Sequence, residues 1–324
     1  MDIRGKKIVL IGGAGLIGSH TLDQLIKEDV EEVIIYDNMT RGSFSNIQDS
    51  LKDPRVKLYE VGGDILQTDI LELALDNTHA VFHFAALWLL HCHEFPRSAF
   101  ETNIRGTFNV IESCVRKNIN KLVFSSSASV YGDAEYEPMD ELHPFNNKNF
   151  YGATKIAAEA ILRAYYHRYH LNYIGLRYMN VYGPRQDYKG AYIAVIMKML
   201  DAIDKGKSPE IYGSGDESFD FISAEDCGRA NICAMKSENT DSFYNVGTGK
   251  KTTLKELAKT LLELTDSDQK INYVSKEEKT FVKSRIGCPK KAKKEINFTY
   301  KIELKEDLKR LIQWRKERIA NVSV

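Results

Sequence analysis

A tyrosine and a lysine four residues apart, Tyr151 and Lys155, are the two side chains with the clearest chemical potential in this chain. On a helix they would share one face, about one turn apart. An ammonium group beside a phenol favours the phenolate, so the spacing predicts a Tyr151 pKa lowered from ~10 toward the working pH. A phenolate beside a sugar or alcohol hydroxyl is a general base for hydride chemistry. Alone, the pair fits a functionless surface Tyr and Lys better; a serine cluster upstream, Ser125 to Ser127, and a glycine-rich turn change that balance.

The glycine-rich turn lies near the start of the chain, where Gly12, Gly15 and Gly18 separate an apolar run from an amphipathic one. The first glycine permits a tight turn, the second lets a pyrophosphate approach, and the third lets helix and strand touch. Free N–H groups and the dipole at a helix N-terminus favour the anion. The turn therefore predicts a dinucleotide site.

An acid follows at the distance that such a site requires. Asp37 closes the second apolar run, nineteen residues after Gly18. A carboxylate there accepts hydrogen bonds from ribose hydroxyls and repels a 2′-phosphate, which favours NAD over NADP. Arg41 lies close by and offers a partner for a phosphate, but Asp37 holds the primary position.

Composition excludes several classes of function. The 324 residues include 45 Lys and Arg against 45 Asp and Glu, so the formal net charge is zero. This argues against non-specific binding to nucleic acid or to an anionic membrane. Five cysteines without a C-x-x-C pair indicate a reduced cytosol rather than a disulfide framework. No signal peptide is visible, and the longest apolar stretch, 81–90, is too short to span a bilayer, so we expect a cytoplasmic protein.

The elements that would position these residues follow an alternating order. Short apolar runs alternate with amphipathic ones through the first half, which predicts an α/β fold with a parallel sheet covered by helices on both faces. The predicted strands are 7–11, 32–36, 56–61, 80–85, 121–126 and 172–178. The predicted helices are 16–28, 70–75, 98–117 and 151–170, with two more at 254–264 and 304–317.

The chain changes character after Gly183-Pro184, where segments become shorter and more polar. We therefore expect a Rossmann-type, doubly wound NAD-binding domain over 1–180. A smaller C-terminal α/β substrate-binding domain would cover 181–324, with 219–247 returning to the first domain.

Together these motifs resemble the extended short-chain dehydrogenases/reductases, in the NAD-dependent branch of nucleotide-sugar epimerases and dehydratases. The matching motifs run from residue 8 to about 249. Besides the glycine turn and the Tyr-x-x-x-Lys motif, they are 37–38, 63–65, 83–86, Asn103, 125–132, 176–186 and 244–247.

The resemblance implies that Tyr151 is the base, that Lys155 holds the nicotinamide ribose, and that Ser127 hydrogen-bonds the sugar hydroxyl being oxidised. It implies cofactor contacts, with 64–65 beside the adenine, 85–86 along the dinucleotide and Asn103 near the nicotinamide. The full cofactor set is Gly12, Gly15, Leu16, Ile17, Gly18, Asp37, Asn38, Asp64, Ile65, Ala85, Ala86, Asn103, Ser125, Tyr151, Lys155 and Met179. The substrate set is Trp88, His91, His93, Ser127, Asn180, Arg185, Tyr212 and Arg285, in which Asn180 and Arg185 approach the diphosphate.

The reaction is narrowed by two positions after Ser127. The branch shares removal of hydride from a sugar carbon, usually C4, and its dehydratases typically carry an Asp-Glu pair directly after the Ser or Thr. Ala128 and Ser129 stand there instead. A C4-epimerase that works through a transient 4-keto sugar needs only Ser127, Tyr151 and bound NAD, and this is the predicted function. The alternatives are a dehydrogenase that releases the keto sugar, a 4,6-dehydratase, and a non-catalytic NAD-sensing protein.

The same resemblance also leads us to expect a particular nucleoside in the substrate and a particular oligomeric state. A UDP-sugar is the default substrate, with GDP and dTDP open, and a homodimer would form through the helices 98–117 and 151–170. Phe219 and Cys288 stand where the family usually has an Arg and an acid for the nucleotide.

The segment 87–94 departs from the family pattern because it is apolar and then rich in histidine. As an extended segment it would place His91 and His93 on one side. Cys92 between them adds a possible metal ligand, but without a second ligand cluster we expect no metal. Contacts with the sugar, an added acid or base, or a structural role remain open for these residues.

Overall fold

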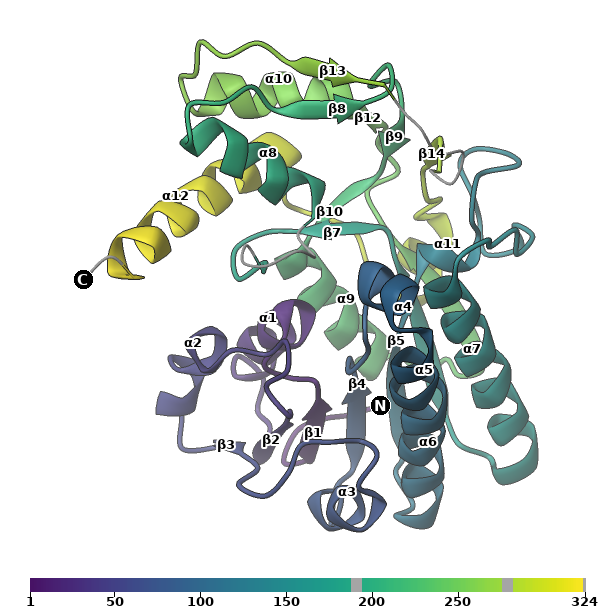
Figure 1. Cartoon of the computed structure of the whole chain (residues 1–324). Coiled ribbons are helices and arrows are strands. Elements are labelled where there is room, and N and C mark those ends of the chain that lie inside the picture. The colour runs from purple at the N-terminus through teal and green to yellow at the C-terminus, as the bar shows by residue number, and fades with distance from the viewer. Residues whose placement is uncertain (188–193, 276–281, 323–324) are drawn as a thin grey trace.

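The computed structural model describes residues 1–187, 194–275 and 282–322, with side chains through 318. A seven-stranded, all-parallel sheet fills the lower half of Figure 1. In spatial order its strands are β11 (Ser242–Val246), β6 (Tyr173–Tyr178), β5 (Lys121–Ser127), β4 (Ala80–His83), β1 (Lys7–Ile11), β2 (Glu32–Tyr36) and β3 (Val56–Leu58). The chain runs outward from β1 to β3 and then restarts on the other side at β4. The predicted α/β, doubly wound sheet is therefore confirmed, and its strand order reverses between β1 and β4.

Alternate side chains along the strands pack into two separate hydrophobic cores, one on each face of the sheet. Ile8 and Leu10 of β1 belong to one hydrophobic cluster, whereas Val9 and Ile11 belong to the other. Helices α1 (Leu16–Leu25) and α9 (Ala224–Lys236) pack together over the first. Helices α3 (Thr68–Ala74), α6 (Thr107–Arg116) and α7 (Phe150–Tyr169) cover the second. Because both faces are covered, the strands are apolar on both sides.

Two predicted strands end early at the site edge. The strand expected over 80–85 stops at His83, because the N–H groups of Phe84 and Ala85 both donate to the carbonyl of Ile11, at 2.7 and 3.2 Å. The strand expected over 56–61 stops at Leu58, ahead of Gly62 and Gly63, whose φ angles are 83° and 118°. In both places the chain leaves the sheet where a ligand would approach its carboxyl edge.

The helix predicted over 98–117 is composite. It consists of α5 (Pro96–Ala99), a π-helical stretch η2 (Phe100–Gly106) and α6. Short helices α2 (Phe44–Ile47) and α4 (Leu89–Glu94) and the 3-10 turns η1 (Ser50–Lys52) and η3 (Ala128–Val130) complete this half. Among the described residues, no helix has the length and apolarity that a membrane crossing requires.

The upper half of Figure 1 is built around a third apolar cluster. Its helices are α8 (Val195–Asp204), α10 (Leu254–Leu264) and α12 (Leu304–Val322), with α11 (Lys290–Ile296) packed against β11. Its short strands pair as β7 (Asn180–Tyr182) with β10 (Phe221–Ser223), β8 (Glu210–Tyr212) with β13 (Asn272–Val274), and β9 (Ser218–Phe219) with β12 (Thr252–Thr253) and β14 (Ser284–Arg285). From β10 the chain passes through α9 back to the large sheet at β11.

A buried acid in the first turn of α12, Asp307, gives a pH-dependent prediction. Asp307 is fully buried, with Arg310 Nη1 3.3 Å from its carboxylate. Burial raises the pKa of Asp307 to about 6, above its ordinary value of 3.8. The folded chain therefore binds this proton more tightly than the unfolded chain. The stability from this group is complete below pH 3.8 and is lost as the pH rises to about 6.

An Asp307→Asn variant is therefore expected to raise the free energy of unfolding at pH 7 by on the order of 1–2 kcal/mol, and to change it little at pH 4. Arg310 keeps Glu225 as a partner at 2.6 Å. Urea denaturation of both proteins at the two pH values measures the difference. An equal loss of stability at pH 4 and pH 7 would contradict this account of the carboxyl.

Candidate active site

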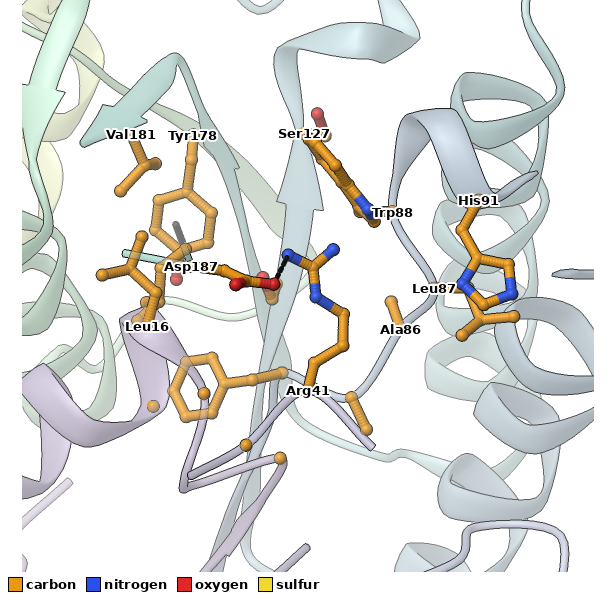
Figure 2. A pocket seen from close by; sticks show the side chains of 18 of the residues that line it. Leu16, Arg41, Ala86, Leu87, Trp88, His91, Ser127, Tyr178, Val181 and Asp187 are labelled. Atoms are coloured by element: carbon orange, nitrogen blue, oxygen red, sulfur yellow. Dashed lines mark hydrogen bonds and ion pairs between the residues drawn. The ribbon is translucent and has the colours of Figure 1, made fainter. Parts of the chain in front are cut away.

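A cavity of about 750 Å³ opens at the carboxyl edge of the large sheet, beside the point where the strand order reverses. The turns after β1, β2 and β4 line it, together with the end of β5, the start of α7 and the chain around β7. Residues 194–196, Phe219 and Phe221 line it from the upper half. Figure 2 shows part of this lining.

The glycine turn forms the floor of the cavity. Gly12 has φ 79°, and a Cβ there would lie 2.6 Å from the backbone N of Ala85. A Cβ on Gly18 would collide with the carbonyl oxygen of Gly12. Gly15 precedes α1, whose N-terminus has no side-chain cap, so its N–H groups remain available to an anion. Gly15, Leu16, Ile17 and Gly18 all line the cavity, as do Gly12 and Asn38.

The acid after β2 is held by the same turn. Asp37 Oδ2 accepts a hydrogen bond from Ala14 N and Oδ1 from Met39 N, each at 2.9 Å. Burial raises the pKa of this carboxyl, and these two hydrogen bonds oppose the rise. The acid therefore borders the cavity at the end of β2, next to the turn that carries the glycines. Asp64, Ile65, Ala85 and Ala86 line the adjoining wall.

The predicted catalytic residues meet at the end of β5. Asn149 Oδ1 accepts a hydrogen bond from Gly152 N at 2.8 Å, which begins α7 at Phe150 and places Tyr151 in its first turn. Lys155 Nζ lies 5.6 Å from the centroid of the Tyr151 ring and donates to the carbonyl of Ser125 at 2.7 Å. Ser127 lies close enough to the hydroxyl of Tyr151 to lower its pKa. Of these residues, Ser125, Ser127, Tyr151 and Lys155 line the cavity.

The predicted lowering of the Tyr151 pKa is wrong for this structure. Burial raises the pKa of Tyr151 to about 12, which exceeds the lowering by Ser127 and by the charges of Arg41 and Arg285. Burial also lowers the pKa of Lys155 to about 8. The sequence showed the pair but not the dehydrated environment in which the pair lies, and here desolvation outweighs the neighbouring charges.

Asn103 is buried behind the cavity wall rather than in its lining. Its Oδ1 accepts from Leu87 N at 2.7 Å, and its Nδ2 donates to Leu87 O at 2.8 Å and to Thr154 Oγ1 at 3.2 Å. The amide thus ties the loop at 87 to α7. These are positioning contacts, and the approach of Asn103 to the nicotinamide stays a prediction.

The predicted substrate residues divide into two groups. Those that line the cavity are Trp88, His91, Ser127, Asn180 and Arg185, and Met179 of the cofactor set lines it too. Outside the lining, Tyr212 is 54% exposed on β8, and Arg285 is buried with Nη2 3.3 Å from Gly132 O. The charge of Arg285 still acts on the Tyr151 hydroxyl.

His93 also lies outside the lining, because the predicted extended segment is wrong. Residues 89–94 form helix α4, on which side chains two apart point in nearly opposite directions. His91 lines the cavity, whereas His93 is exposed, and Cys92 is buried. Within the described ranges, no group of three or more His, Cys, Asp or Glu side chains is arranged to hold a metal ion.

Sequence reasoning missed a buried ion pair beneath the catalytic residues. Arg177 on β6 donates to both carboxylate oxygens of Glu159, at 3.0 and 2.7 Å, and both side chains are at most 5% exposed. Glu159 Oε1 also accepts from Ser126 at 2.5 Å, and Arg177 donates to the Tyr131 hydroxyl at 2.8 Å. The spacing of Glu159, four residues after Lys155, was the available signal.

Arg41 was noted from the sequence only as a possible phosphate partner, and Asp187 was not selected. Both line the cavity and are ion-paired at 3.4 Å. The wall at 194–196 carries no motif that could have indicated it.

Comparison with known proteins places this site in context. The family model described as "NAD dependent epimerase/dehydratase family" matches residues 8–247. A Methanocaldococcus jannaschii protein named as a candidate UDP-glucose 4-epimerase is 36% identical over 95% of this chain and 98% of its own length. The UDP-N-acetylglucosamine 4-epimerase of Methanobrevibacter ruminantium, solved with UDP-N-acetylmuramic acid, is 32% identical over 97% and 99% of the two chains, with a TM-score of 0.91. The Thermotoga maritima UDP-glucose 4-epimerase, solved with UDP-glucose, is 31% identical over 97% and 99%, with a TM-score of 0.88.

Proposed function

Because this chain belongs to the NAD dependent epimerase/dehydratase family, we propose that it is a nucleotide-sugar 4-epimerase that acts on UDP-sugars. The observation that carries the proposal is the meeting of Ser127, Tyr151 and Lys155 in the cavity that the glycine turn floors. The UDP-sugar 4-epimerases described above, which match nearly the whole chain, support the reaction and the nucleoside.

The cavity fits NAD as the cofactor. A Cβ on Gly12 or Gly18 would collide with the backbone of Ala85 or of the turn itself, so only glycine lets the turn bring the N-terminus of α1 this close to the sheet, where a pyrophosphate would lie. Asp37 borders the cavity where a ribose would lie. When bound, NAD supplies an acceptor for hydride from the sugar carbon and a donor that returns it. The protein must supply the rest: a base for the hydroxyl proton and a dry cavity that retains the ketone.

Tyr151 is the residue that accepts the proton of the sugar hydroxyl, in its phenolate form, with Ser127 close beside it. Because burial keeps this phenol protonated, the phenolate depends on positive charge nearby: Arg41 and Arg285 lower the pKa, and the positively charged nicotinamide ring of bound NAD would add to them. Lys155 contributes a positive charge to the same buried region and is anchored to the Ser125 carbonyl. When hydride returns to the opposite face of the keto sugar, Tyr151 gives back the proton. The protein is then in its starting state, as an isomerase requires.

Dehydration and release of the ketone are the enzymatic alternatives. Dehydration needs added acid and base groups beside Ser127, but the next two residues, Ala128 and Ser129, are buried in η3 and carry no carboxyl. Among the described lining residues the carboxylates are Asp37, Asp64 and Asp187. The first two border the predicted dinucleotide path, and Asp187 is ion-paired with Arg41. These placements favour epimerisation over dehydration.

Proton NMR in deuterated water tests the proposal. The purified protein, without added NAD, is given UDP-glucose, and GDP- and dTDP-hexoses serve as comparisons. We expect inversion at C4 without gain of deuterium, because the hydride returns from the carbon to which it went. Deuterium at C5 with loss of the C6 hydroxyl would show a dehydratase, and a keto product that appears only with an external oxidant would show a dehydrogenase.

We further propose that the protein is a cytoplasmic homodimer. Residues 1–180 would form the NAD-binding domain, to which 219–247 return, and the rest of 181–324 would form the substrate domain. Exposed aromatic side chains around the predicted helical interface support the dimer: Phe95, Phe100, Phe150 and Tyr169 are each 38–49% exposed. Sedimentation velocity tests this, since a single species at the monomer mass would contradict it.

A further inference from the structure

Arg41 lines the cavity together with Trp88 and Asp187. Figure 2 shows its side chain reaching up from the loop after β2, between Asp187 and Trp88. Its guanidinium carbon is 4.6 Å from the centroid of the Trp88 ring, and Nη2 is 3.4 Å from Asp187 Oδ2. The charge of Arg41 also reaches the hydroxyl of Tyr151. The pair formed by Arg41 and Asp187, here called the cross-cavity pair, thus joins the loop after β2 to the chain after β7.

The charges of the cavity show which cation is available to a ligand. Its described lining carries three cations, Arg41, Lys155 and Arg185, and three aspartates. Lys155 Nζ is 2.7 Å from the Ser125 carbonyl, and Arg185 Nη1 is 2.8 Å from Asp23. The contact of Arg41 with Asp187 is longer, and both side chains remain partly exposed, at 32% and 43%. An exposed pair of this kind contributes little and is readily exchanged.

A diphosphate is the ligand chemistry that matches this arrangement. A guanidinium presents a planar fork of donors, which fits phosphate oxygens as well as it fits a carboxylate. Stacking on Trp88 supports the plane of the guanidinium and leaves its edges free to donate. The proposed function requires this cavity to hold two diphosphates, one in NAD and one in the nucleotide sugar.

We propose that Arg41 is a diphosphate-binding residue that exchanges Asp187 for phosphate oxygens when the cavity fills. Asp187 acts as the internal competitor that holds the guanidinium in place until then. The inference rests on the proposed function, and it adds a specificity-determining cation and its competing carboxylate to the site.

Binding measurements on the full-length protein test whether phosphate oxygens replace Asp187 on Arg41. They also show whether the diphosphate that binds Arg41 belongs to the nucleotide sugar or to NAD. For the substrate, the NAD-loaded protein is titrated calorimetrically with UDP and with uridine. For the cofactor, protein freed of bound NAD is titrated with NAD and with adenosine, followed by the intrinsic tryptophan fluorescence, to which Trp88 and Trp314 contribute. Arg41→Gln is expected to raise the Kd of UDP, of NAD, or of both about tenfold, and to leave uridine and adenosine unchanged. If only the affinity for UDP falls, Arg41 binds the diphosphate of the nucleotide sugar. If only the affinity for NAD falls, it binds the diphosphate of the cofactor.

A second variant distinguishes exchange from simple attraction. Asp187→Asn removes the competitor, so it is expected to lower the Kd of the affected ligand about threefold when Arg41 is present. In the Arg41→Gln background this gain should shrink, because no guanidinium remains to be released. Arg41→Lys keeps the charge without the fork and should fall between wild type and Arg41→Gln. Equal unfolding temperatures of the variants without ligand confirm that each is folded.

Two results would overturn the inference while leaving the proposed function intact. One is that Arg41→Gln binds UDP and NAD as tightly as wild type does. The other is that Arg41→Gln raises the Kd of uridine and adenosine as much as it raises the Kd of UDP and NAD, which would indicate a distorted cavity. Wild-type protein that bound neither UDP nor NAD would overturn the proposed function, and the inference with it.

Discussion

A Tyr151→Phe variant is expected to lose about three orders of magnitude in the rate of C4 epimerisation while retaining NAD. Removal of a positioned proton-transfer group costs roughly 10²–10⁴-fold. The substitution removes one oxygen, and Ser127 and Lys155 keep their other contacts, with Ser129 N and Ser125 O respectively. Initial rates of sugar inversion and the NAD content of the purified variant measure the two quantities.

The matched control is Tyr169→Phe, at the opposite end of the same helix, where the side chain is 49% exposed and lies outside the cavity lining. This variant should keep the wild-type rate. Turnover by Tyr151→Phe within a few-fold of wild type would remove Tyr151 from the role of base. Loss of NAD together with activity would instead make Tyr151 a residue that mainly holds the cofactor.

An Arg177→Met variant is expected to lose about 3–5 kcal/mol of the free energy of unfolding, because Glu159 would be left charged and buried without its partner. Whole domains are stable by about 5–15 kcal/mol, so the variant should be close to unfolding at room temperature. Both side chains are at most 5% exposed, and the hydrogen bonds from Arg177 to Tyr131 and to the Glu141 carbonyl are lost as well. Urea denaturation, followed by circular dichroism, measures the loss.

The double variant Arg177→Met, Glu159→Leu should recover much of this stability, since it removes the stranded charge together with its partner. An exposed pair supplies the control. Arg105 and Glu101 are 55% and 45% exposed, and Arg105→Met should cost less than about 1 kcal/mol. A loss from Arg177→Met no larger than that from Arg105→Met would show that the pair is not essential to the packing of α7.

The sequence was sufficient for those elements whose pattern depends on local chemistry. The apolar runs at 7–11 and 32–36 became strands with the predicted bounds, and the amphipathic run at 254–264 became α10 with its predicted bounds. In α10 a capping box between Thr253 and Glu256 begins the helix. The glycine turn and the Tyr-x-x-x-Lys motif likewise come together because the carboxyl ends of parallel strands lie at one edge of the sheet.

The features that the sequence did not predict depend on contacts between residues far apart in the chain. Residues 87–94 contain no helix-start signal, and their helix is held by Asn103 and α7. The raised pKa of Tyr151 depends on burial by several elements, which spacing on one helix does not reveal. Arg41 and Asp187 are 146 residues apart, and their pairing across the cavity follows from the fold alone.

The two sides of the cavity differ in their readiness for a ligand. On one side, the Asn103 amide satisfies both backbone groups of Leu87 and also contacts α7, so that wall is already ordered before binding. Binding against an ordered wall loses little conformational entropy, whereas the opposite side must release the cross-cavity pair. Because the cross-cavity pair is partly exposed, salt would screen both this pair and the attraction of Arg41 for phosphate, so the affinity for a diphosphate would depend on salt mainly through the side of Arg41.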